Sequence, residues 1–161
     1  MLEKLIQMIE GNAERMAEEL KGMLLGNPET SSYQVLADIT LYKDIFGIYS
    51  HLGYWLLRDV EKAEVRTYYS ETGRKLSAMG FPLHEVVQAQ AATKRHIWDS
   101  ISDAGIMRTA KDLDSAVDLI TFLNRFFDMA TYYVTLGYCE ALGLQGESGS
   151  ETWNAPEVST R

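Results

Sequence analysis

The stretch YYSETGRKLSAMGFPLHEVV, residues 68–87, predicts a helix, a sharp turn and a second helix. Gly80 suits the left-handed residue that ends a helix, because glycine has no Cβ to clash in that conformation. Pro82 fits the first turn of the next helix, where an N–H group would have no intrahelical partner. The stretch therefore predicts a tight structural corner between two helices.

Both helices of this corner extend beyond the quoted stretch. We expect the helix before it to start at Asp59 and run to about Met79, and the helix after it to end near Gly105. Further upstream, apolar residues recur at the i, i+3, i+4, i+7 spacing over residues 2–24, which is typical of an amphipathic helix. The Gly-Asn-Pro sequence at residues 26–28 would end that helix.

Two more helices complete the prediction. One begins after Ser31 or Ser32, since either hydroxyl can cap a helix, and it carries a wide aromatic stripe. The other begins at Thr109, which with Asp112 three residues later resembles a capping box, and it keeps its helical period to Leu142.

The domain organisation follows from the same pattern. Residues 143–161 have no period and many small polar side chains, so we expect a flexible tail there. No alternating run is long enough to be a strand. The sequence thus predicts an all-α fold with a single domain of five or more helices over residues 1–142, either globin-like without haem or a helical bundle.

Charge and composition narrow the function classes. The chain has 15 Lys and Arg against 23 Asp and Glu, a net charge of −8, which disfavours contact with nucleic acid phosphates. Its apolar runs are far shorter than the ~20 residues that cross a bilayer. The single cysteine, Cys139, cannot form an intramolecular disulfide, and no signal peptide pattern opens the sequence. We therefore expect a cytoplasmic protein that binds neither nucleic acid nor membrane.

Residues that could support catalysis or metal binding do not form any known pattern. The three histidines, His51, His84 and His96, are not part of a Glu-x-x-His or His-Glu-x-x-His motif. Cys139 has no base beside it in sequence, and no constellation of acid, base and nucleophile stands out. We expect no catalytic residues, no metal and no cofactor, and hence no enzymatic activity.

Several short motifs carry a resemblance to a known family. Residues 69–73, 80–86 (GFPLHEV) and 95–98 (RHIW) resemble the N-terminal helical domain of RsbR/RsbRD-type stress-response regulators, and similar domains precede some bacterial histidine kinases. Residues 126–128 (FFD) and 137–138 (GY) in the last helix also fit. The resemblance extends over nearly the whole chain up to Leu142.

This resemblance implies a sensory domain that is similar to a globin without haem and that dimerises through its helices. The wider family of globin-coupled sensors places a haem-ligating histidine between two glycines at the spacing of Gly73 and Gly80. Leu76 occupies that position here and cannot ligate iron. The resemblance therefore implies a homodimeric domain without haem that passes a signal to an attached output domain. The sequence departs from this pattern, because the tail over residues 143–161 is too short to be such a domain. We therefore expect a stand-alone regulator whose output lies in a separate protein, such as a histidine kinase or an anti-sigma-factor regulator, or a chain that only binds a ligand.

An alternative function is that of a carrier for a small apolar ligand such as a fatty acid. Met, Tyr and Trp are frequent on the predicted core faces, and the space of a missing haem must be either filled or occupied. We expect such a pocket to be lined mainly by aromatic and apolar residues, namely Phe46, Tyr49, Tyr69, Leu76, Met79, His84 and Trp98. Either Tyr49 or His84 would orient the polar head of the ligand.

Overall fold

The computed structural model describes residues 2–36, 38–57, 62–105 and 107–143. Within these ranges the regular structure is entirely helical, which confirms the all-α prediction. The elements are α1 (Leu2–Gly11), α2 (Ala13–Gly26), the 3-10 helix η1 (Pro28–Val35), α3 (Asp38–Leu57), α4 (Lys62–Ala78), α5 (Leu83–Asp103) and α6 (Ala110–Ala141). None of these helices is long and apolar enough to span a membrane.

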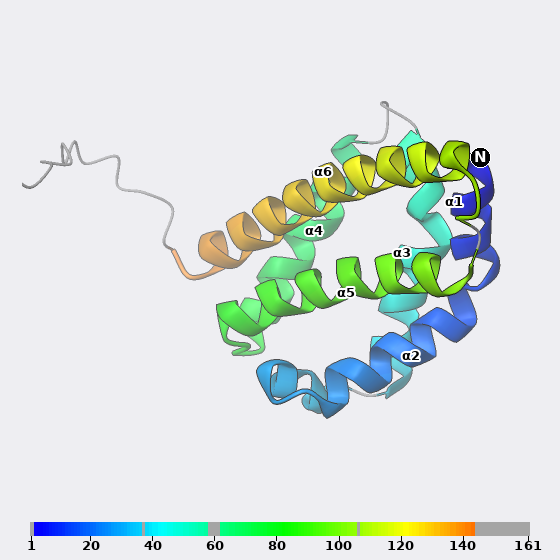
Figure 1. Ribbon diagram of the computed structural model, residues 1–161. Helices are drawn as coiled ribbons and strands as arrows, with labels where there is room; N and C mark the ends of the chain where they lie inside the picture. The colour runs from blue at the N-terminus through cyan, green and yellow to red at the C-terminus, as the bar shows by residue number, and fades with distance from the viewer. Residues whose placement is uncertain (1, 37, 58–61, 106, 144–161) are drawn as a thin grey trace, which may run out of the picture.

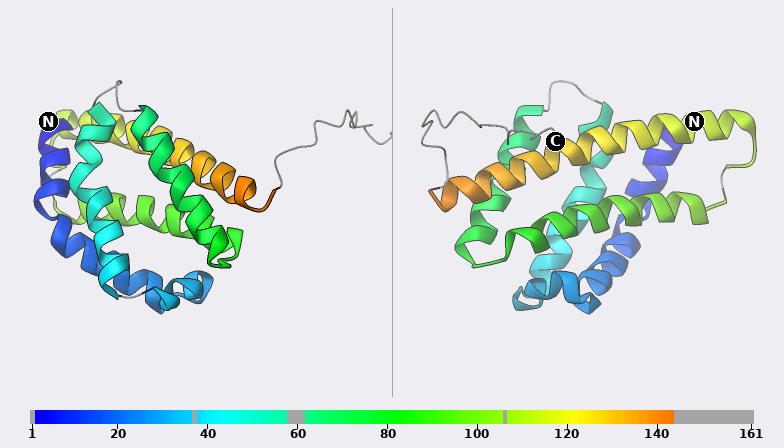
Figure 2. Two further views of the ribbon diagram at one scale, coloured as in Figure 1. Left: turned by 180° about the vertical axis from the view of Figure 1, so that it is seen from behind. Right: turned by 60° about the vertical axis from the view of Figure 1, so that its left-hand side comes forward.

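The helices form two crossing layers. Figure 1 shows α5 and α6 side by side in one layer, with α3 and α4 crossing behind them, and the reverse view in Figure 2 places α3 and α4 in front. α4 and α6 make the most extensive contact of any helix pair, while α1 and α2 pack mainly on α3. This arrangement is consistent with both alternatives of the prediction, the globin-like fold and the helical bundle.

The N-terminal helix differs from the prediction because it is split in two. Asn12 separates α1 from α2, with φ −107° and ψ 13°, and its side-chain amide donates to the Met8 carbonyl at 2.7 Å. Asparagine side chains compete for backbone groups in this way, and the preceding Gly11 is also a poor helix former. The apolar faces of both halves are nevertheless buried in the common core.

The expected helix start at Ser31 or Ser32 is wrong. These residues lie in η1, where the Asn27 side chain accepts the Glu29 N–H at 2.9 Å, and the next α-helix is α3. The Ser32 N–H is taken up by the Glu85 carboxylate of α5 at 2.8 Å, a contact distant in sequence that no local pattern reveals.

Other predicted boundaries can be compared directly. Thr109 and Asp112 form a complete capping box at the start of α6, as expected. Pro82 is the N-cap of α5, just before the first turn rather than within it, and has an extended ψ of 134°. The start at Asp59 and the tail after Gly143 lie outside the described residues.

Candidate functional site

The helix pair α4 and α6 meets at two glycines. A Cβ atom on Gly73 would lie 2.0 Å from the Val134 carbonyl oxygen, and one on Gly137 would lie 2.0 Å from the Ser70 carbonyl oxygen. Both distances are far below van der Waals contact, so the two backbones touch where no side chain fits. The close packing expected of Gly73 is therefore present.

The corner after α4 is closed by hydrogen bonds on both sides. Gly80 has φ 78°, and the Phe81 and Gly80 N–H groups donate to the carbonyls of Leu76 and Ser77, the pattern of a Schellman motif. From α6, the buried hydroxyl of Tyr138 donates to the Phe81 carbonyl. The family-like sequences at residues 80–86 and 137–138 thus meet in space.

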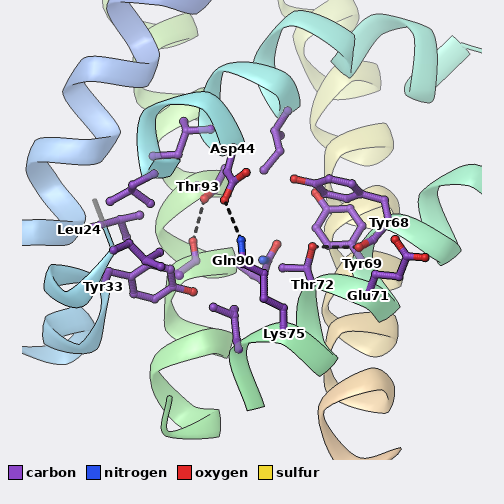
Figure 3. A pocket seen from close by; sticks show the side chains of 16 residues that line it. Leu24, Tyr33, Asp44, Tyr68, Tyr69, Glu71, Thr72, Lys75, Gln90 and Thr93 are labelled. Atoms are coloured by element: carbon purple, nitrogen blue, oxygen red, sulfur yellow. Dashed lines mark hydrogen bonds and ion pairs between the residues drawn. The ribbon is translucent and has the colours of Figure 1, made fainter. Parts of the chain in front are cut away.

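A cavity of about 280 Å³ lies beside this corner (Figure 3). Its wall is formed by α2, η1, α3, α4 and α5, and α6 contributes nothing to the lining. The apolar part of the wall comes mainly from aliphatic side chains: Leu24, Leu36, Leu41, Ile45, Ile48, Leu76 and Ala89.

The polar part of the wall combines charges with phenols. Asp44 of α3 and Lys75 of α4 point toward each other with Nζ and Oδ2 4.0 Å apart, and each side chain is about half exposed. Figure 3 shows Tyr33 on one side of the cavity and Tyr68 on the other. Burial raises the pKa of Asp44, and burial with the nearby Asp44 charge raises the pKa of Tyr68 to about 12. The phenols are therefore neutral at physiological pH.

Tyr69 links the cavity to an aromatic cluster. Its ring packs on Trp55, Tyr68 and Phe126 with centroids 5.0–6.5 Å apart. Its hydroxyl is fully buried and has no hydrogen-bond partner among the described residues. A buried hydroxyl without a partner costs about 1–3 kcal/mol, so a polar ligand atom or a water at this position would stabilise the domain.

A second polar arrangement joins α3, α5 and α2. The fully buried hydroxyl of Tyr49 lies 2.7 Å from His96 Nδ1, and His96 Nε2 lies 3.1 Å from a carboxylate oxygen of Glu19, which reaches solvent. Because the carboxylate can only accept, Nε2 donates, and in the tautomer with a single proton on Nε2 the Nδ1 atom accepts from Tyr49. The three residues connect the core to the surface of α2.

The structure brings together only part of the predicted pocket. Tyr69 and Leu76 line the cavity, whereas the other five predicted residues do not. Phe46 stacks on Tyr42 at 5.9 Å, and Tyr49 is bonded to His96. Met79 and His84 are exposed, and Trp98 lies in a groove between α5 and α6.

Sequence reasoning missed the residues that give the cavity its polarity. Tyr33, Asp44, Tyr68 and Lys75 come from η1, α3 and α4, and none belongs to a local motif. Asp44 and Lys75 are charged residues within helices, and periodicity alone does not distinguish a charge that faces a cavity from one on a solvated face. Among the described residues no group of three or more His, Cys, Asp or Glu side chains is arranged to hold a metal ion.

The groove between α5 and α6 is a separate surface feature. It is lined by Ala91, Lys94, Arg95, Trp98, Ile120, Leu123 and Asn124. On the same helix as Ile120, the side chains of Leu113 and Val117 are 57% and 54% exposed. Apolar side chains of this size at successive turns indicate an unpartnered helix face.

The chain from the end of α3 onward matches a known family. The family model described as the RsbT co-antagonist protein rsbRD N-terminal domain matches residues 49–151, well over half of the sequence. No curated protein and no solved structure matches the chain. The matched range contains the Gly80 corner, the glycine crossing of α4 with α6 and the Trp98 groove. The resemblance inferred from the corner motifs is thereby confirmed, and the chain belongs to the family of RsbT co-antagonist protein rsbRD N-terminal domains.

Proposed function

We propose that the chain is a sensory or regulatory domain of bacterial stress-response signalling that acts as a homodimer and has no catalytic activity of its own. The family match over α4, α5 and α6 supports the regulatory role. The partner that receives the signal would be a separate protein of the same pathway, such as a histidine kinase or an anti-sigma-factor regulator.

The homodimer is supported by the groove between α5 and α6 and by the exposed face of α6 beside it. Leu113 and Val117 offer an apolar strip, and the exposed acids Asp114 and Asp118 follow them directly in sequence. The groove itself carries Lys94 and Arg95 of α5. In a two-fold dimer, Asp114 and Asp118 of each copy would face the Lys94 and Arg95 groove of the other copy. The surface would therefore be complementary to itself.

The test is the mass of the protein in solution by light scattering. At high micromolar concentration we expect the mass of a dimer for the unmodified chain and of a monomer for Val117→Glu. Val35→Glu is the matched control, because Val35 is 69% exposed on η1 and far from α6 in sequence, and it should remain dimeric. A monomeric unmodified chain, or a dimer that survives Val117→Glu, would refute this interface.

The alternative function of a carrier for a fatty acid has the cavity in its favour. Its volume of about 280 Å³ lies near the lower end of the range for small-molecule sites. The charges of the lining argue against an anionic ligand, because Asp44 and Glu71 both line the cavity and Lys75 is the single cation among the described residues that line it. Binding of a fatty acid with unchanged oligomeric mass would support the carrier.

A further inference from the structure

We propose that the cavity between α3, α4 and α5 binds a small amphiphilic primary amine, with its apolar body against Ile45, Ile48 and Leu76 and its ammonium group on the Asp44 carboxylate. This site would supply the input signal of the proposed regulatory domain, and in that sense it rests on the proposed function.

The charge of the cavity favours a cation. Among the described residues of the lining, Asp44 and Glu71 contribute two carboxylates against the one ammonium group of Lys75. The chain as a whole carries a net charge of −8, which attracts cations and repels anions at long range. Burial raises the pKa of Asp44, which means that the distant Lys75 ammonium does not fully compensate the loss of water around the carboxylate, and the ammonium group of a bound amine would compensate it better.

The lining offers uncharged hydrogen-bond acceptors in addition to the carboxylates. The Asp44 carboxylate and the neutral phenol oxygens of Tyr33 and Tyr68 are acceptors from three different elements around one space (Figure 3). The buried Tyr69 hydroxyl has no partner among the described residues and lies in the same wall. A heteroatom in the body of the ligand, or a water carried in with it, would satisfy this group.

Lys75 occupies the position that the ligand would take. Its ammonium group stands 4.0 Å from Asp44 at the distant limit of an ion pair, and both side chains are about half exposed. Such a pair contributes only about 0–1 kcal/mol, so a ligand that also buries apolar surface can displace it. Removing Lys75 should therefore strengthen amine binding, whereas it should weaken binding of any carboxylate ligand.

Isothermal titration calorimetry with 2-phenylethylamine tests the proposal, with 2-phenylethanol and 3-phenylpropionate as a neutral and an anionic probe of similar shape. We expect saturable binding of the amine and at least about tenfold weaker binding of the other two, the size of effect typical of a hydrogen bond to a charged group. Asp44→Asn should weaken amine binding by a similar factor, and Lys75→Met should tighten it. Asp128→Asn removes an exposed charge from α6, outside the cavity, and should leave binding unchanged.

Leu76→Trp provides a steric check, because a larger side chain at this lining position should block the amine. Circular dichroism and the mass by light scattering show whether each variant is still folded and whether the dimer is retained. No saturable binding at millimolar amine, equal binding of 3-phenylpropionate, or unchanged binding by folded Asp44→Asn would overturn the proposal. Since amine binding and oligomeric mass are measured separately, a failure of the amine site can be distinguished from a failure of the proposed homodimer.

Discussion

Gly73 of α4 and Gly137 of α6 lie at the crossing of these two helices, and each faces the backbone of the opposite helix. An added Cβ at either position would come within 2.0 Å of a carbonyl oxygen, of Val134 in one case and of Ser70 in the other. Since backbone atoms cannot move aside as a flexible side chain can, this pair of glycines sets how closely the two layers of the fold approach each other.

Gly73→Ala should destabilise the domain by about 1–3 kcal/mol, the usual cost of overpacking. The control is Gly22→Ala, since Gly22 lies inside α2 and, apart from its chain neighbours and the backbone of its own helix, no atom of the described residues lies within 4 Å of the place that an added methyl group would take. This control should raise the free energy of unfolding by about 0.5–1 kcal/mol, because alanine favours helix over glycine. Urea unfolding followed by circular dichroism measures both, and equal effects of the two substitutions would contradict the close crossing.

Tyr138→Phe should loosen the corner between α4 and α5. The substitution removes the hydrogen bond that the buried Tyr138 hydroxyl donates to the Phe81 carbonyl. We expect a loss of about 1–2 kcal/mol in the free energy of unfolding, and faster hydrogen exchange near Gly80, because the carbonyl is left without its partner. Tyr132→Phe, at a position 62% exposed on the same helix, should change stability by less than about 0.5 kcal/mol. A Tyr138→Phe variant as stable as this control would show that the bond is dispensable.

Tyr49→Phe should cost about 1–3 kcal/mol, because it leaves His96 Nδ1 without the hydroxyl that lies 2.7 Å away in the core. A double-mutant cycle with His96→Leu isolates the pair. Both single substitutions remove the same hydrogen bond, so the combined loss should be smaller than the sum of the single losses by about 1 kcal/mol. Strictly additive losses, measured by urea unfolding, would contradict the link between α3 and α5.

Glu85 and Asp112 should make the domain sensitive to acid. Hydrogen bonds from Ser32 hold the pKa of Glu85 below its ordinary value of 4.5, and hydrogen bonds from Thr109 hold the pKa of Asp112 below 3.8. A carboxylate with a lowered pKa in the folded state contributes stability that is present above its unfolded pKa and is lost as the pH falls through the folded one.

Unfolding measured by urea between pH 7 and pH 3 checks this expectation. The stability advantage of the unmodified chain over Glu85→Gln should be constant above about pH 5 and should shrink below pH 4.5. An advantage that stayed constant down to pH 3 would mean that the Glu85 contact to η1 does not depend on charge.

The amino-acid sequence by itself determined the features that depend on neighbours within one or two helical turns. The helical period, the left-handed Gly80 and the capping box of Thr109 with Asp112 are local, and all three are present. Local competition also explains the one missed break, where the Asn12 amide takes the Met8 carbonyl and splits a predicted helix. The motifs around the corner were enough to indicate the family.

Only the tertiary structure decided which side chains meet. The cavity takes its lining from five elements, and the partners Asp44 with Lys75 and Tyr49 with His96 lie far apart in the chain. Of the seven residues predicted for a pocket, Tyr69 and Leu76 line the cavity and the other five do not. The rotation of each helix about its axis decides which residues face the cavity, and packing against neighbouring helices sets that rotation. Periodicity shows which face of a helix is apolar, but the crossing of α4 over α6 at Gly73 and Gly137 decides what that face contacts.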